Sequence, residues 1–144
     1  MTVVDRELIA ELIPHQGAMS LLDRVASWSD SSIVAVSMTH RAPDHPLRRN
    51  GCLRAVHLCE YGAQAAALHG GLLARAAGTT AEPGYLVSLR DVTLTRARID
   101  DLAGELRIHA ELLLQDSASW QYGFAASHAG VTLASGRLAI IRRK

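Results

Sequence analysis

The feature that most constrains the fold is the long segment from Cys52 to Arg75, which is apolar on nearly every side. Its polar side chains, scattered among Ala, Leu, Val, Cys and Gly, are Arg54, His57, Glu60, Gln64, His69 and Arg75. A helix that is apolar all round is normally buried within its own protein. A membrane span is the rival interpretation, but Arg54 and Glu60 would each cost about 2.5 to 3.5 kcal/mol near a bilayer centre. We therefore expect a buried central helix and no membrane association.

Patterns typical of strands lie on both sides of this segment. Before it, a short helical pattern over residues 5–13 ends at Pro14, and two apolar runs follow at residues 19–28 and 33–38. After it come four segments with strand-like patterns: residues 85–97, 106–115, 120–126 and 131–141. The order predicts an α+β fold in which one antiparallel β-sheet wraps a long central α-helix.

Such a sheet covers only one side of the helix, so the remaining apolar surface predicts association with another copy or a paralogue. At 144 residues with 49% apolar content, the whole chain, 1–144, fits one globular domain. A formal charge of +1 gives no field that would favour nucleic acid. Residues 1–12 carry acidic side chains and no cleavage pattern, so we expect no signal peptide and a cytoplasmic protein. Cys52 and Cys59 would lie two turns apart on the helix, too far for a disulfide, and are interpreted as small apolar residues.

Three segments resemble the 3-hydroxyacyl-acyl carrier protein dehydratases. They are LIPHQGAMSLLDRV at residues 12–25, EYGAQA at residues 60–65 and AGEL at residues 103–106. The chain resembles still more closely the dehydratase-like proteins of aryl polyene pigment clusters. The resemblance implies a hotdog fold, a homodimer or an oligomer with a paralogous hotdog subunit, and an acyl thioester on acyl carrier protein or coenzyme A. It implies no bound cofactor.

Dehydrating a 3-hydroxyacyl thioester requires a base for the α-proton, an acid for the departing hydroxyl and donors for the thioester oxygen. In the family the first two are a histidine and a carboxylate, paired across a subunit interface. Glu60 matches the carboxylate, and it is the one acidic residue of the predicted central helix. Burial there would raise the pKa of its carboxyl group, which suits proton transfer near neutral pH. The alternative is a structural Glu60 that reaches solvent or Arg54.

Two histidines are candidates for the second group. His45, in Asp44-His45-Pro46-Leu47, matches the family's loop histidine with one residue too many before Glu60. His57 precedes Glu60 by three residues and would share its helix face, although a core histidine is the simpler interpretation. His15 matches the family opening and is expected to close the turn after the first helix.

Further candidates concern substrate binding. Backbone N–H groups at Gly51 and Cys52, where the central helix is expected to begin, would hold the thioester oxygen near the positive end of the helix dipole. Gly51 is equally an ordinary turn residue. Gln64, one turn beyond Glu60, would orient the carboxylate. His57 and Glu60 form half of a metal site at most, so no metal is expected.

Three functions remain open. The first is a dehydratase that uses His45 and Glu60 to form a trans-2-enoyl thioester. The second is a hotdog thioesterase in which Glu60 activates water or attacks the acyl group. The third is a non-catalytic subunit whose paralogue holds the active pair.

Overall fold

The first part of the chain forms a short helix and a strand pair. The computed structural model describes residues 3–81 and 84–142. Helix α1, Arg6–Leu12, begins where the Asp5 carboxylate accepts the Leu8 N–H at 3.1 Å. A 3₁₀ turn at Gly17–Met19 leads to strands β1, Arg24–Trp28, and β2, Ser32–Ser37, which pair antiparallel.

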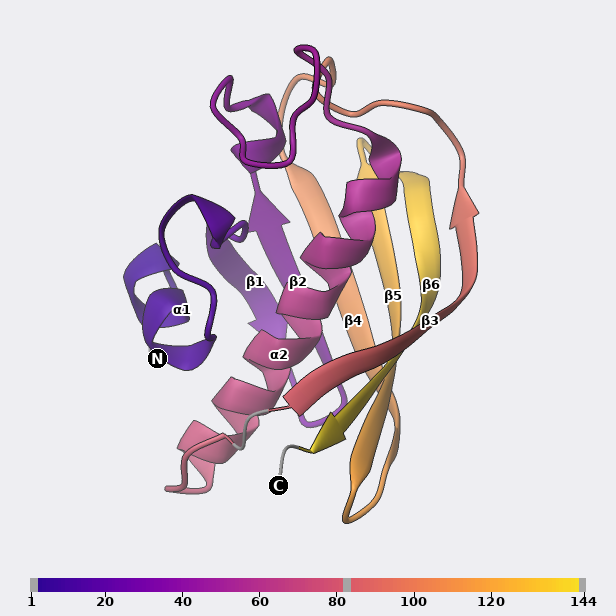
Figure 1. The fold of residues 1–144 in the computed structure, drawn as a ribbon. Coiled ribbons are helices and arrows are strands. Elements are labelled where there is room, and N and C mark those ends of the chain that lie inside the picture. The colour runs from indigo at the N-terminus through magenta and orange to yellow at the C-terminus, as the bar shows by residue number, and fades with distance from the viewer. Residues whose placement is uncertain (1–2, 82–83, 143–144) are drawn as a thin grey trace.

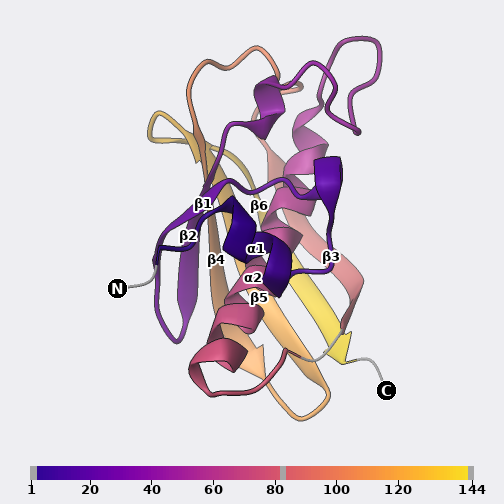
Figure 2. The ribbon, with the colours of Figure 1, turned by 90° about the vertical axis from the view of Figure 1, so that its left-hand side faces the viewer.

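The central helix α2, Leu58–Ala76, follows a 3₁₀ turn at Ala55–His57. Strands β3, Gly84–Leu94, β4, Leu106–Gln115, β5, Ser119–His128, and β6, Val131–Arg142, complete an antiparallel sheet in the order β1-β2-β4-β5-β6-β3. Figures 1 and 2 show α2 lying across one face of this sheet, with α1 beside it. The structure confirms the predicted sheet wrapped around one long helix.

The core fills the space between α2 and the sheet. Alternate residues of β4, Leu106, Ile108 and Ala110, are fully buried beneath the helix, as the period-two pattern predicts. Helix α2 packs tightly on the sheet at Gly62, where an added Cβ would lie 2.6 Å from the Phe124 ring. The same ring also lies close to Gly136, the cross-strand partner of Phe124, where an added Cβ would lie 2.9 Å from it. Phe124 therefore occupies a slot between two glycines.

The expectation that the central helix begins near Cys52 is wrong. Backbone groups there have other partners: the Cys52 N–H donates to the Arg49 carbonyl at 3.0 Å, and the Leu53 N–H donates to the Asp100 carboxylate at 2.8 Å. Cys52 thus lies in the loop before the helix. Cys59 lies within α2 and is buried, and both cysteines are free thiols. The strand expected from residue 19 also begins later, at Arg24, because the chain first makes the 3₁₀ turn.

Strand β3 forms one edge of the sheet and is covered by little else. It pairs only with β6 among the strands of the described chain, and α2 packs mainly on β2, β4, β5 and β6. Leu86 and Leu89, opposite Ile140 and the buried Leu138, face the helix side of the sheet yet remain 43% and 44% exposed. An apolar strand is left with an open edge and an open inner face. Within the described residues, no helix is long and apolar enough to cross a membrane.

Candidate active site

Glu60 lies in the first turn of α2, and His15 and Gln64 bind its carboxylate. His15 Nε2 donates to Glu60 Oε1 at 3.1 Å, and Gln64 Nε2 donates to the same oxygen at 3.1 Å. The Glu60 side chain keeps 29% of its exposure, so it is neither sealed in the core nor free in solvent. The result is a fixed, accessible carboxylate.

This arrangement holds Glu60 ionised, contrary to the expectation of a raised pKa. The hydrogen bond from His15 lowers the pKa of the Glu60 carboxyl, and the bond from Gln64 adds to this effect. Burial acts in the opposite direction and is outweighed. The positive end of the α2 dipole also favours the anion in the first turn. Glu60 is therefore a carboxylate that can accept a proton at neutral pH.

Gln64 fastens this carboxylate to the segment before β1. Its Oε1 accepts the Leu21 N–H at 2.9 Å, and its Nε2 donates to the Met19 carbonyl at 2.8 Å as well as to Glu60. The amide group is fully buried with the rest of the residue. The hydrogen bond to Glu60 expected at one helical turn is thus present, while a role for Gln64 in substrate binding stays a prediction.

His45 is buried and binds Tyr61, the residue that follows Glu60 in α2. Its Nδ1 accepts the Leu47 N–H at 3.1 Å, so Nε2 donates to the Tyr61 hydroxyl at 3.0 Å. Tyr61 in turn donates to Thr39 Oγ1 at 2.7 Å. Burial lowers the pKa of His45 and raises the pKa of Tyr61 to about 12, so both are neutral at pH 7. Because successive side chains point about 100° apart around a helix, a histidine on Tyr61 does not face Glu60 of the same chain.

His57 is the last residue before α2 and is half-buried. Burial, followed by the charges of Arg49 and Arg54, lowers the pKa of its imidazole. Within the described chain, neither His57 nor His45 hydrogen-bonds Glu60. The Glu60 carboxylate accepts a hydrogen bond from His15 instead. Sequence reasoning assigned His15 to the turn after α1 and missed this pair. The available signal was the PH dipeptide of the same motif that carries the family resemblance.

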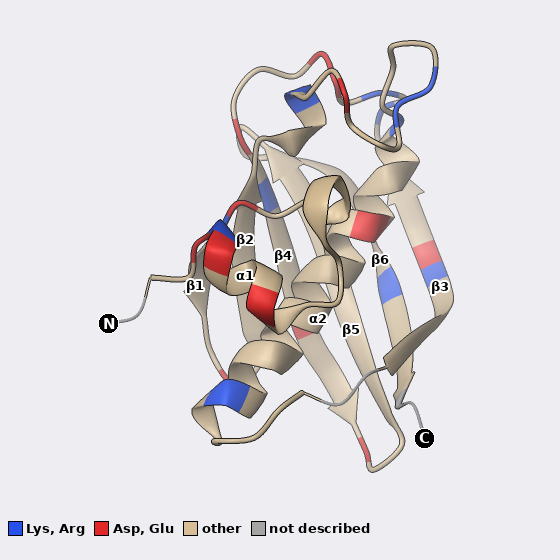
Figure 3. Ribbon diagram, turned by 60° about the vertical axis from the view of Figure 1, so that its left-hand side comes forward, with Lys and Arg blue, Asp and Glu red and all other residues tan. Residues whose placement is uncertain are grey.

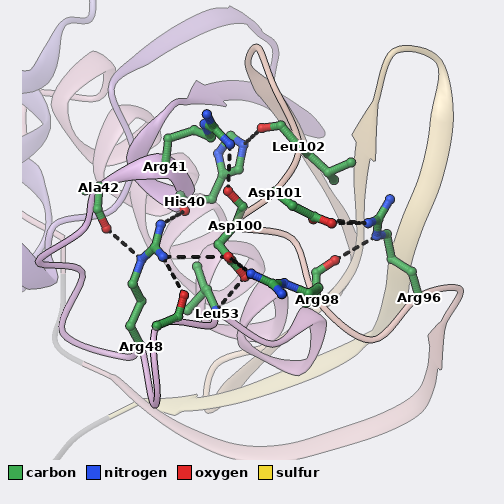
Figure 4. Close-up of polar contacts among 11 residues, drawn as sticks. His40, Arg41, Ala42, Arg48, Leu53, Arg96, Arg98, Asp100, Asp101 and Leu102 are labelled. Atoms are coloured by element: carbon green, nitrogen blue, oxygen red, sulfur yellow. Dashed lines mark hydrogen bonds and ion pairs between the residues drawn. The ribbon is translucent and has the colours of Figure 1, made fainter.

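The loop that leads into α2 is held by the buried carboxylate of Asp100 (Figure 4). Asp100 accepts the Leu53 N–H and forms an ion pair with Arg98, which holds the pKa of its carboxyl well below the usual range. Arg48 lies 3.7 Å from the same carboxylate and donates to the carbonyls of Ala42 and Gly51, both at 2.8 Å. The loop with Gly51 and Cys52 is thereby fixed at the N-terminal end of α2.

Gly51 itself is exposed, with φ +74°, a value that favours glycine in a turn. The Cys52 N–H, expected to hold the thioester oxygen, already donates to Arg49. Substrate binding by these two residues stays a prediction. Among the residues that the structure describes, no three His, Cys, Asp or Glu side chains come together as metal ligands.

A curved antiparallel sheet wrapped around one long helix places the chain in the hotdog class, and solved structures share this arrangement. The dehydratase heterocomplex ApeI:P from Xenorhabdus doucetiae contains a chain with a TM-score of 0.83 and 24% identity, covering 94% of this chain and 91% of that one. A zebra fish thioesterase superfamily member 2 gives 0.64 at 15% identity, covering 96% and 95%. A Streptococcus pneumoniae hypothetical thioesterase with coenzyme A gives 0.61 at 14%, covering 83% and 84%.

The particular family follows from the sequence. The profile of the ApeP-like family, described as ApeP dehydratase, matches residues 7–144. The chain therefore belongs to the ApeP-like dehydratase family, which confirms the resemblance to the aryl polyene cluster proteins. No curated protein matches it at a significant level.

Proposed function

We propose that the protein is a 3-hydroxyacyl thioester dehydratase in which Glu60 removes the proton from the carbon next to the thioester carbonyl. The observation that carries this proposal is the ionised, partly exposed Glu60 carboxylate, held by His15 and Gln64 at the start of α2. Membership of the ApeP-like dehydratase family supports the reaction class. The substrate is an acyl thioester of a carrier protein or coenzyme A, handled in the cytoplasm, and the reaction needs no cofactor.

The chemistry follows from the protonation state of Glu60. The carboxylate removes a proton from the carbon next to the thioester carbonyl, and the electron pair left behind forms the new carbon–carbon double bond. The bond from the neighbouring carbon to its hydroxyl breaks, and the departing oxygen takes a proton to leave as water. Protonated Glu60 can return that proton, or a second acid can supply it. The product is the trans-2-enoyl thioester.

A second hotdog subunit is part of the proposal. The open edge and exposed apolar inner face of β3 are suited to pairing with another strand, which would extend the sheet. Among the structural relatives, the ApeI:P assembly is a heterocomplex. We expect a homodimer or a complex with a paralogous hotdog subunit. In such a complex His45 or His57 of one subunit would meet the acid of the other, as the family pairing implies.

One observation favours a second candidate, a non-catalytic subunit. Both ring nitrogens of His45 are engaged within its own chain, to Leu47 and Tyr61. A chain that keeps its histidine for structure would support the fold and binding surface of a paralogue that holds the active pair. The state of Glu60 separates the two candidates, because only a catalytic chain needs its carboxylate.

The test replaces Glu60 by glutamine, which keeps the shape and removes the proton acceptor. We expect Glu60→Gln to lower enoyl thioester formation about 100-fold or more, because a positioned base contributes about 10² to 10⁴. Glu111→Gln, an exposed carboxylate on β4, is the matched control and should keep full activity. Product formation is followed by mass spectrometry, on the protein with any hotdog partner that copurifies.

Each other result identifies a different function. Full activity of the complex with Glu60→Gln would show that the chain is the non-catalytic subunit. Release of free thiol and acid without an enoyl product would show a thioesterase, with Glu60 activating water.

A further inference from the structure

A chain of hydrogen bonds runs from His45 to the segment before β1. His45 Nε2 lies 3.0 Å from the Tyr61 hydroxyl, which lies 2.7 Å from Thr39 Oγ1. Thr39 Oγ1 in turn lies 2.9 Å from the Leu21 carbonyl oxygen. The rings of His45 and Tyr61 stack with their centroids 6.1 Å apart, and the two residues are 5% and 0% exposed. The bond between these two rings is therefore shielded from solvent.

Every proton in this chain has one direction. A hydroxyl carries a single proton, and Thr39 uses its proton on the Leu21 carbonyl. Tyr61 must then donate to Thr39, and its oxygen is left to accept from His45. The Leu47 N–H donates to the Nδ1 of His45, so the His45 proton lies on Nε2. With both nitrogens engaged, the imidazole offers a substrate neither a free acceptor nor a free proton.

The Leu21 peptide group joins this chain to the carboxylate of Glu60. Its carbonyl accepts from Thr39, and its N–H donates to Gln64 Oε1 at 2.9 Å. The same Gln64 side chain donates to Glu60. Figure 3 shows the acidic position in the first turn of α2, which is Glu60. The imidazole and the carboxylate are thus fixed through one peptide group, and His45 cannot turn toward Glu60 without breaking these bonds.

The groups around His45 also disfavour its protonated form. Burial is the main cause that lowers the pKa of its imidazole. The charges of Arg48, His57 and His40 act in the same direction, and the charge of Asp44 acts against them. Protonation would also place a proton on Nδ1, facing the backbone N–H that now donates to this nitrogen. The hydrogen bonds and the surrounding charges therefore favour the same neutral ring.

We propose that Tyr61 is a positioning residue that withholds His45 from the substrate, so that Glu60 returns to the departing hydroxyl the proton that it removes. This inference rests on the proposed function and deepens it. Glu60 takes the proton from the carbon next to the thioester carbonyl, and that electron pair forms the double bond as the bond to the hydroxyl breaks. The proton then passes from Glu60 to the departing oxygen. Water leaves, and the carboxylate is restored.

The first test follows the His45 proton. Tyr61→Phe keeps the ring and removes the oxygen that accepts from Nε2. Tyr122→Phe is the matched control, because it removes the hydroxyl that lies 2.8 Å from His69, another buried histidine of α2. Heteronuclear NMR of histidine-labelled protein, with any hotdog partner that copurifies, identifies the protonated nitrogen and measures its exchange with water. The spectrum of His45→Gln assigns the His45 signals.

We expect the unaltered protein to carry the His45 proton on Nε2, in slow exchange with water. Tyr61→Phe should speed this exchange about tenfold or more, because a buried hydrogen bond is lost. Tyr122→Phe should leave the His45 exchange rate in place. A His45 proton on Nδ1, or equal exchange rates in the unaltered protein and Tyr61→Phe, would overturn the assignment of Tyr61. The protonated nitrogen is read from the unaltered protein, so this criterion holds even if Tyr61→Phe does not fold.

The second test measures whether His45 takes part in the chemistry. Glutamine in its place keeps an N–H donor and cannot ionise. We expect His45→Gln to lower kcat less than about tenfold, against about 100-fold or more for Glu60→Gln, because a positioned acid or base contributes about 10² to 10⁴. The midpoints of kcat/KM against pH should stay in place in His45→Gln.

Two results of the second test would overturn the proposal. One is a loss of about 100-fold or more in His45→Gln with an unchanged melting curve, since a catalytic acid or base contributes that much. The other is the disappearance of one limb of the pH profile in the same variant. Failure of the unaltered protein to form any enoyl product would contradict the proposed function and the return of the proton by Glu60. The NMR measurement would still decide whether Tyr61 holds His45.

Discussion

At the scale of single residues, the site depends on which histidine Glu60 binds. His15 reaches the carboxylate from the segment after α1, while His45 is used by Tyr61 and Leu47. His15 is also the first of the causes that lower the pKa of Glu60. We therefore regard His15 as a positioning residue that sets the ionisation and direction of the carboxylate.

Replacing His15 by phenylalanine removes the donor and keeps a flat ring. The pKa of Glu60 should then rise, because its largest stabilising bond is lost while burial still disfavours the anion. If ionised Glu60 is the base, the acid limb of kcat/KM against pH should move to higher pH. His128→Phe, at a β5 histidine whose ring bonds the Ala103 carbonyl, should leave this midpoint in place. A midpoint that ignores His15→Phe, or follows His128→Phe, would contradict the assignment.

At the scale of elements, much of the fold was predictable because the strands have alternating patterns and α2 is a long segment that is apolar all round. The alternation in β4 was visible in the sequence. In the structure, β5 and β6 are joined by a turn at Ala129 and Gly130, whose φ values of 49° and 81° are left-handed. The start of α2 was not visible in the sequence, because the apolar run extends back to Cys52 while tertiary bonds to Arg49 and Asp100 fix the backbone there. The pairing of His15 with Glu60 was likewise hidden, since it depends on how α1 packs beside α2.

The slot around Phe124 predicts how closely α2 must approach the sheet. Gly62→Ala should destabilise the protein by about 1 to 3 kcal/mol, because the new methyl group would overlap the Phe124 ring. Gly70→Ala is the control on the same helix, where an added Cβ meets nothing within 4 Å. It should be neutral or slightly stabilising, since alanine favours helix. Urea unfolding measures both changes, and equal stabilities would contradict the close packing of the slot.

At the scale of the whole molecule, β3 connects the fold to its proposed partner. From the sequence we predicted only that one side of the central helix would be uncovered. The apolar inner face of β3 was not predicted, because a sequence does not show which strand lies at the edge of the sheet. The sheet order places β3 there and leaves Leu86 and Leu89 exposed.

Leu89→Lys tests this interface by placing a charge on it. We expect association with the second hotdog subunit to weaken about tenfold or more, because a lysine buried there would lose its hydration. Leu113→Lys on β4 makes the same change at a residue of equal exposure, 44%, away from the edge. Sedimentation velocity measures the assembly of each variant. If Leu113→Lys dissociates the complex and Leu89→Lys does not, a different surface forms the interface.

The contact between Leu53 and Asp100 also bears on synthesis of the chain. The loop before α2 leaves the ribosome before its anchor does, because Asp100 lies 47 residues after Leu53. Helix α2 can form early from its local contacts, but the loop before it gains this anchor only when residues 96–101 have emerged. His15 and Gln64, which hold Glu60, are made much earlier, so the carboxylate can be positioned before the loop beside it is fixed.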